Sequence, residues 1–142
     1  MRVIGACKTG YASDVADAIV WASGGTIDGI PSIETPARVV SMSLTGKGAC
    51  PSFLQSAVNQ ALASGTVLIA ASGNAGGNSE DYFPANCAGV VAVAASTRTG
   101  ALATYSNLGA NVGLAAPGGD AAGAIFALTA SQVRISLPYP MF

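Results

Sequence analysis

Helical hydrophobic patterns occur in two stretches of the chain. Apolar side chains recur at helical spacing over residues 14–23, and Ser13 stands where an N-cap residue is expected. A stronger pattern covers residues 52–64, and Ser52 and Gln55 open it in the order of an S-x-x-Q capping box. Each stretch is followed by glycine. The sequence therefore predicts two amphipathic helices, each of which buries its apolar side against a neighbouring layer.

Short apolar runs of strand length separate and follow these helices. The most hydrophobic run covers residues 66–71, and its near-continuous apolar character is typical of a strand buried on both faces of a parallel sheet. Further predicted strands, with a hairpin turn at 98–100, are 2–6, 38–44, 89–95, 102–106 and 112–116. Strands and helices alternate over the first half of the chain. This order predicts an α/β domain, a three-layer arrangement with a mostly parallel sheet and flanking helices.

The composition excludes several classes of protein. The 142 residues are about one domain long, since domains typically contain roughly 100 to 200 residues. Hydrophobic residues make up 51%, charged residues 9%, and the mean hydropathy is +0.50, so most of the chain is not intrinsically disordered. The net charge of -1, with no Lys/Arg cluster, argues against a nucleic-acid partner. No apolar run reaches the roughly 20 residues that span a bilayer, so we expect no membrane helix.

The chain has no histidine, which removes the commonest general base near neutral pH and the commonest metal ligand. Its three cysteines are far apart and form no C-x-x-C pair, so a zinc or thioredoxin-type site has no local support. Any catalytic interpretation therefore has to explain a missing base.

Two loops follow predicted strands at the edge where open parallel sheets bind ligands. They are residues 43–48 and residues 72–78. In the second loop, small residues let a ligand backbone approach, and Asn74 places an amide donor at the mouth of the crevice. The alternative interpretation is that these glycine-rich loops are only tight turns. The spacing matches neither a phosphate-binding loop nor a G-x-S-x-G elbow, and no histidine is present to activate Ser72.

Six segments follow one another along the chain: 38–44 (RVVSMSL), 66–74 (TVLIAASGN), 83–87 (FPANC), 90–95 (VVAVAA), 105–109 (YSNLG) and 115–119 (AAPGG). In this order they resemble the middle of a subtilisin-like serine protease. The resemblance is strongest to secreted bacterial members and covers roughly residues 1–120 as the central part of the peptidase domain. Residues 121–142 form a divergent tail that is Ala-rich and contains prolines. The resemblance implies an incomplete subtilisin-like fold.

The resemblance also implies roles for two groups of residues around the predicted cleft. It identifies Asn74 with the family's oxyanion-hole asparagine, whose amide donates to the oxygen of the attacked peptide carbonyl. The wall of the pocket for the substrate side chain before the scissile bond is matched by Ala71, Ser72 and Gly73. The edge segment that pairs with an extended peptide is matched by Ser43, Leu44 and Thr45.

The sequence departs from the family at several points. Thr45 places a side chain where the family usually has glycine, which puts peptide affinity in question. The catalytic Asp, His and Ser motifs have no counterpart, and Asp28 is interpreted as a turn residue. The chain therefore resembles an internal fragment, and we expect it to be inactive by itself. Thr97 replaces an aspartate that helps bind calcium in several relatives, so we expect no calcium there.

The same family context bears on cations, thiols and localisation. Main-chain carbonyls near Ala85, Cys87 and Val90 leave open a weak calcium or sodium site, and no other metal or cofactor is expected. Cys50 and Cys87 fall at the same end of the predicted sheet, so they form either a disulfide or two free thiols. Cys7 is then buried or unpaired. Relatives of this kind imply a secreted protein, although the sequence shows no export signal.

Two hypotheses follow. The first is a fragment of a secreted serine endopeptidase that acts on peptide or protein substrates and carries the oxyanion asparagine and part of the cleft. The alternative is a non-catalytic peptide-binding or assembly module on the same scaffold. In either case, sheet surface that further segments would cover is expected to favour self-association.

Overall fold

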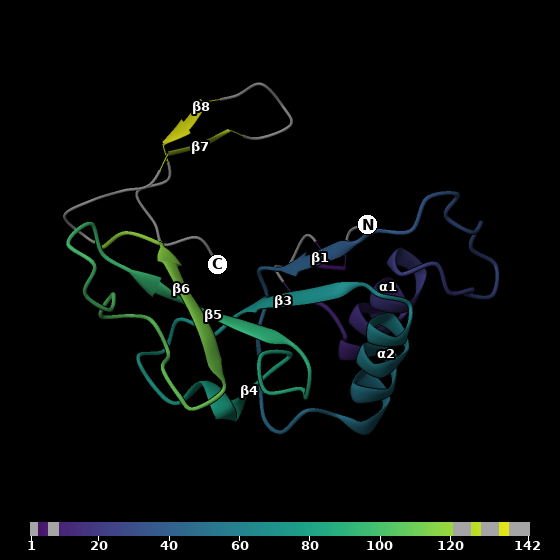
Figure 1. Cartoon of the computed structure of the whole chain (residues 1–142), viewed down its shortest axis with the longest axis horizontal. Helices are drawn as coiled ribbons and strands as arrows, with labels where there is room; N and C mark the ends of the chain where they lie inside the picture. The colour runs from purple at the N-terminus through teal and green to yellow at the C-terminus, as the bar shows by residue number, and fades with distance from the viewer. Residues whose placement is uncertain (1–2, 6–8, 121–125, 129–133, 137–142) are drawn as a thin grey trace.

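A computed structural model describes residues 3–5, 9–120, 126–128 and 134–136 (Figure 1). Its helices are α1 (Ala12–Ala22), α2 (Ser52–Ala63) and the short 3-10 helix η1 (Ser79–Asp81). Its strands are β1 (Val39–Met42), β2 (Gly46–Lys47), β3 (Val67–Ala71), β4 (Tyr82–Phe83), β5 (Val91–Ser96), β6 (Val112–Pro117), β7 (Phe126–Leu128) and β8 (Arg134–Ser136). In the part of the chain that is described, no helix is both long and apolar enough to cross a membrane.

The main sheet has four strands in the order β1, β3, β5, β6, and all neighbouring pairs are parallel. Ile69, in the middle of β3, lies opposite Ser41 on one side and Val91 on the other. The crossover from β1 to β3 contains α2, as Figure 1 shows. The predicted α/β fold with a parallel sheet and flanking helices is confirmed.

The core lies between β3 and the two helices. Leu54 and Val58 of α2 are fully buried, as is Leu68 of β3, and Ile19 of α1 is 1% exposed. Burying an aliphatic side chain of this size stabilises the fold by about 1.5–3 kcal/mol. Alternate residues of β3 and β5, including Ala70 and Ala92, are buried among these side chains. One face of β3 thus packs against the helical layer.

Both predicted helices are present, but their predicted caps are wrong. Helix α1 begins one residue before Ser13, and the residue at its N-cap makes no side-chain cap bond. Ser52 is the first residue of α2 rather than its cap. The Gln55 carboxamide turns instead to the main chain of Ala88, accepting from its N–H at 2.8 Å and donating to its carbonyl at 3.0 Å. These two main-chain partners, far away in the sequence, replace the predicted capping box.

Two predicted strands are not borne out, whereas the turn predicted at 98–100 is confirmed. Residues 102–106 contain only an isolated bridge between Leu102 and Ser96, which closes the predicted turn at 98–100. The Ser106 hydroxyl accepts from the Ala95 N–H at 2.8 Å, so a side chain takes the place of a main-chain ladder. The described part of the predicted strand 2–6, residues 3–5, has no strand structure. Strands β2 and β4 form an antiparallel pair that the sequence did not indicate.

Residues 121–142 are described only in part. Strands β7 and β8 pair antiparallel, with Ala127 opposite Ile135. The rest of residues 121–142 and Cys7 lie outside the described residues.

Cys50 and Cys87 join the segment just before α2 to the loop between β4 and β5. Their sulfur atoms are bonded, and their Cα atoms lie 5.2 Å apart. Cys87 is buried, and the main chain of the adjacent Ala88 exchanges two hydrogen bonds with Gln55, one donated and one accepted. The loop is thus held to the N-terminal part of α2 by a covalent bond and by a paired amide contact.

We expect that replacing both cysteines by alanine lowers the free energy of unfolding by about 2–4 kcal/mol, because the cross-link restricts a chain segment in the unfolded state. Urea denaturation of the Cys50→Ala/Cys87→Ala variant and the parent chain measures the difference. Mass analysis without reductant provides the check on the bond. Alkylation of both thiols in the unreduced parent would contradict it.

Candidate active site

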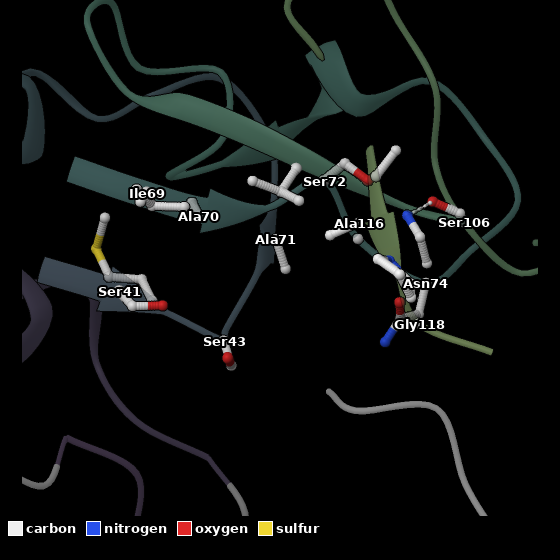
Figure 2. Close-up of a pocket in the computed structure, with 16 residues that line it drawn as sticks. Ser41, Ser43, Ile69, Ala70, Ala71, Ser72, Asn74, Ser106, Ala116 and Gly118 are labelled. Carbon is white, nitrogen blue, oxygen red and sulfur yellow. Dashed lines mark hydrogen bonds between the residues drawn. The ribbon is translucent and has the colours of Figure 1, made fainter. Parts of the chain in front are cut away.

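The carboxyl ends of the four parallel strands surround a cleft. A hollow of about 200 Å³ is lined by the ends of β1, β3, β5 and β6 and by the residues that follow β3. Figure 2 shows Ser43 and Asn74 on either side of Ala71, at the ends of β1 and β3. This is the edge at which open parallel sheets bind their ligands.

A second hollow of about 540 Å³ adjoins the first and shares Ser43, Ala71, Gly73 and Asn74 with it. The described residues that line it are Ile4, Ser43, Leu44, Thr45, Ala71, Gly73 and Asn74. None of these residues is charged. The structure therefore brings together the two segments that the sequence assigned to substrate binding, and Ile4 joins them from the N-terminal region.

Asn74 projects from the loop that follows β3. Its side chain is exposed, and within the described part of the chain its carboxamide has no hydrogen-bond partner. Gly73 just before it has a φ of 107°, a left-handed conformation that favours glycine and turns the chain sharply out of the strand. The amide is thus free to donate to a ligand in the cleft.

Ser72 does not offer its hydroxyl to the cleft. It is 1% exposed, and its Oγ donates to the carbonyl of Asn107 at 2.9 Å. Its contribution to the site is therefore a wall, and its hydroxyl stabilises the loop. Asn107 is a residue that the sequence reasoning used only as part of the Y-S-N-L-G resemblance. A buried asparagine next to a glycine-rich loop leaves no periodic signal by which it would be found.

Thr45 stands at the rim of the second hollow. Its side chain is exposed, and its Cγ2 would lie 3.7 Å from a Cβ built on Gly73. The methyl group therefore occupies space opposite the loop of Asn74. Strand β2, which pairs with β4 directly afterwards, holds the segment in this position.

The described residues that line the two hollows include no titratable side chain. Burial, and secondly the negative charge of Asp120, raise the pKa of Tyr105, so its phenol stays protonated. The sequence has no histidine to take that role. The described lining therefore offers hydrogen-bonding groups and an uncharged surface.

The described residues contain no group of three or more His, Cys, Asp or Glu side chains able to hold a metal ion. Among the carbonyls near the predicted weak cation site, that of Ala85 accepts from Asn111 Nδ2 at 3.0 Å and that of Cys87 from the Val90 N–H at 3.2 Å. Each carbonyl oxygen has a second lone pair. The weak cation site stays a prediction.

Known proteins match this chain in sequence and in structure. The sequence model of the Subtilase family (Peptidase S8) matches residues 1–139. An extracellular protease of Xanthomonas campestris pv. campestris is 52% identical over 118 residues, which are 83% of this chain and 20% of that protein. An extracellular basic protease of Dichelobacter nodosus is 40% identical over 136 residues, 96% of this chain and 22% of that protein.

Solved structures agree with the sequence comparisons. A protease of Pseudoalteromonas arctica superposes with a TM-score of 0.83 at 51% identity, covering 87% of this chain and 36% of that one. A cold-adapted subtilisin-like serine proteinase superposes with a TM-score of 0.69 at 29% identity, covering 82% of this chain and 39% of that one. The chain thus spans about a fifth of the length of the curated relatives named above. Because the family model covers nearly all of its residues, the chain belongs to the subtilase family.

Proposed function

We propose that this chain supplies the oxyanion-stabilising amide and part of the substrate cleft of a secreted serine endopeptidase. The observation that carries the proposal is the exposed, unpartnered carboxamide of Asn74 at the mouth of an uncharged pocket in the described structure. The extracellular proteases among its relatives support secretion and a peptide or protein substrate.

The chemistry assigned to Asn74 is electrostatic. When a nucleophile attacks a peptide carbonyl, negative charge develops on the oxygen, and a fixed N–H donor stabilises that charge more than it stabilises the neutral carbonyl. Asn74 Nδ2 provides such a donor at the end of β3. Rate acceleration follows because the interaction is stronger in the transition state than in the ground state.

The substrate is positioned by the two segments that line the second hollow. An extended peptide pairs with the edge at Ser43 and Leu44 by main-chain hydrogen bonds, as in β-strand addition. The side chain before the scissile bond then enters the space between this edge and the wall formed by Ala71 and Gly73. In the proposed binding mode, the scissile carbonyl lies next to Asn74.

In the alternative, a non-catalytic peptide-binding or assembly module, the same edge binds a peptide and no bond is cleaved. The exposed residues of β6, including Leu114 at 57% exposure, favour association with further chain in either case. The flanking coding sequence distinguishes the two functions. An H-G-T-H motif upstream and a G-T-S-M-A motif downstream support the endopeptidase, whereas an open reading frame without them supports the module.

Removal of the Asn74 amide is expected to reduce turnover strongly. The test uses a chimera in which this segment replaces the aligned 118 residues of the Xanthomonas campestris extracellular protease. In a subtilisin, losing one oxyanion donor costs about 10²–10³-fold in kcat, and the same loss is expected for Asn74→Ala with little change in KM. Steady-state hydrolysis of a peptide p-nitroanilide gives both constants. A folded chimera that is inactive, or an Asn74→Ala variant with parental kcat, would contradict the proposal.

The uncharged lining of the second hollow predicts a preference for uncharged side chains. Peptides with Phe or Leu before the scissile bond are expected to have kcat/KM at least about 100-fold above matched peptides with Asp or Lys, because a charge buried without a partner is costly. Parallel assays of the four peptides with the chimera measure the ratio. Equal rates for Leu and Lys peptides would show that this hollow does not receive the side chain.

Thr45 is expected to obstruct the peptide. In the Thr45→Gly chimera, the space beside Gly73 opens, so KM should fall by about 3- to 10-fold while kcat changes little, which is the pattern of altered uniform binding. The matched control is Thr97→Gly, on a turn outside the cleft. A rise in KM for Thr45→Gly would instead assign the Thr45 side chain a favourable substrate contact.

A further inference from the structure

The loop that carries Asn74 makes its described main-chain hydrogen bonds to a single segment of the chain. The main-chain hydrogen bonds described for residues 73–77 all run to residues 105–108: the Gly76 N–H donates to the Tyr105 carbonyl at 2.8 Å, and the Gly77 carbonyl accepts from the Leu108 N–H at 3.0 Å. Residues 74–77 are exposed, so packing contributes little to their position. The conformation of this loop therefore depends on the segment behind it.

Asn107 lies at the centre of that segment and is completely buried. Its Oδ1 accepts from the N–H groups of Ala75 at 2.9 Å and Gly77 at 3.0 Å, and its Nδ2 donates to the carbonyl of Ser72 at 3.0 Å. Its own N–H donates to the carbonyl of Gly73 at 2.9 Å. One side chain thus fixes the main chain on both sides of Asn74.

The fit between the loop and this side chain is close. A Cβ at Gly73 would collide with Asn107 Nδ2, so the glycine leaves the space that the carboxamide fills. No smaller polar side chain offers an acceptor and a donor at this reach, because serine and threonine carry a single short hydroxyl. The match is specific to an asparagine carboxamide.

We propose that Asn107 is a positioning residue that holds the Asn74 carboxamide where it stabilises the oxyanion. The inference rests on the proposed function of Asn74. An oxyanion donor acts only within about 2.7–3.1 Å of the position that the charged oxygen takes, and a misplacement of about 1 Å can cost about 100-fold in rate. The exposed Asn74 side chain has no described partner of its own, so its place in the cleft is set by its main chain.

The test is a double-mutant cycle in the chimera defined above. Asn107→Ala is expected to lower kcat about 10- to 100-fold and to change KM by less than about threefold. In the Asn74→Ala background, the same substitution should change kcat by less than about twofold, because the amide that it positions is already gone. Losses that multiply in the double variant, or a change confined to KM, would overturn the proposal.

Asn111 provides the matched control. Its carboxamide makes two hydrogen bonds, one from the Ser79 hydroxyl and one to the Ala85 carbonyl, and none to residues 72–77 in the described structure. Asn111→Ala is expected to lower the melting temperature, although less than Asn107→Ala because Asn111 is only half-buried, and to leave kcat within about twofold of the parent. Equal kcat losses in the two variants would indicate general destabilisation and overturn the proposal.

The 142-residue chain itself gives a second readout that does not need catalysis or a folded chimera variant. In ¹⁵N-labelled protein, Asn107→Ala should shift or broaden the side-chain amide signals of Asn74 and speed hydrogen exchange at Ala75 and Gly77 at least about tenfold. Asn111→Ala should leave the Asn74 signals in place. Unchanged Asn74 signals in Asn107→Ala would overturn the proposal. Failure of the proposed function is seen separately, as parental kcat in Asn74→Ala.

Discussion

The site depends on the central position of β3 in the parallel sheet. This strand is hydrogen-bonded on both edges, to β1 and β5, and one face packs on α2 through Leu68 and Ala70. A strand held in this way cannot slip by one residue without moving its buried side chains to the other face. The point at which the chain leaves the sheet is therefore fixed at Ser72, and so is the place where Asn74 emerges.

The parallel arrangement also brings together the other segments that line the cleft. Because parallel strands end at the same edge, the loops after β1 and β3 meet although α2 lies between them in the sequence. Cleft residues are mostly small or uncharged, and their polar groups are largely main-chain. Such a site acts through the fixed positions of its hydrogen-bond donors. Fixed donors are suited to stabilising a negative charge that exists only in the transition state.

The sequence predicted the elements whose patterns are long and strongly periodic. Helix α2 and strand β3 were predicted because their apolar residues follow a helical period and a continuous buried run. The caps were not, because the partners of Gln55 lie in a distant loop and no local pattern reports them. Residues 102–106 alternate like a strand, yet the Ser106 hydroxyl occupies the Ala95 N–H that a longer ladder would need. Asn107 was missed because its partners are also distant in the sequence. They are main-chain groups, which are identical for every residue type.

Gly73 restricts how the cleft can change. Its left-handed φ and the carboxamide of Asn107 behind it exclude any side chain at this position. One position in this wall of the pocket, residue 73, is thus restricted to glycine by steric necessity. Under the proposed function, variation in peptide selectivity arises at the other positions of the lining, such as 45 and 71. Engineering of selectivity in this scaffold has the same restricted choice of positions.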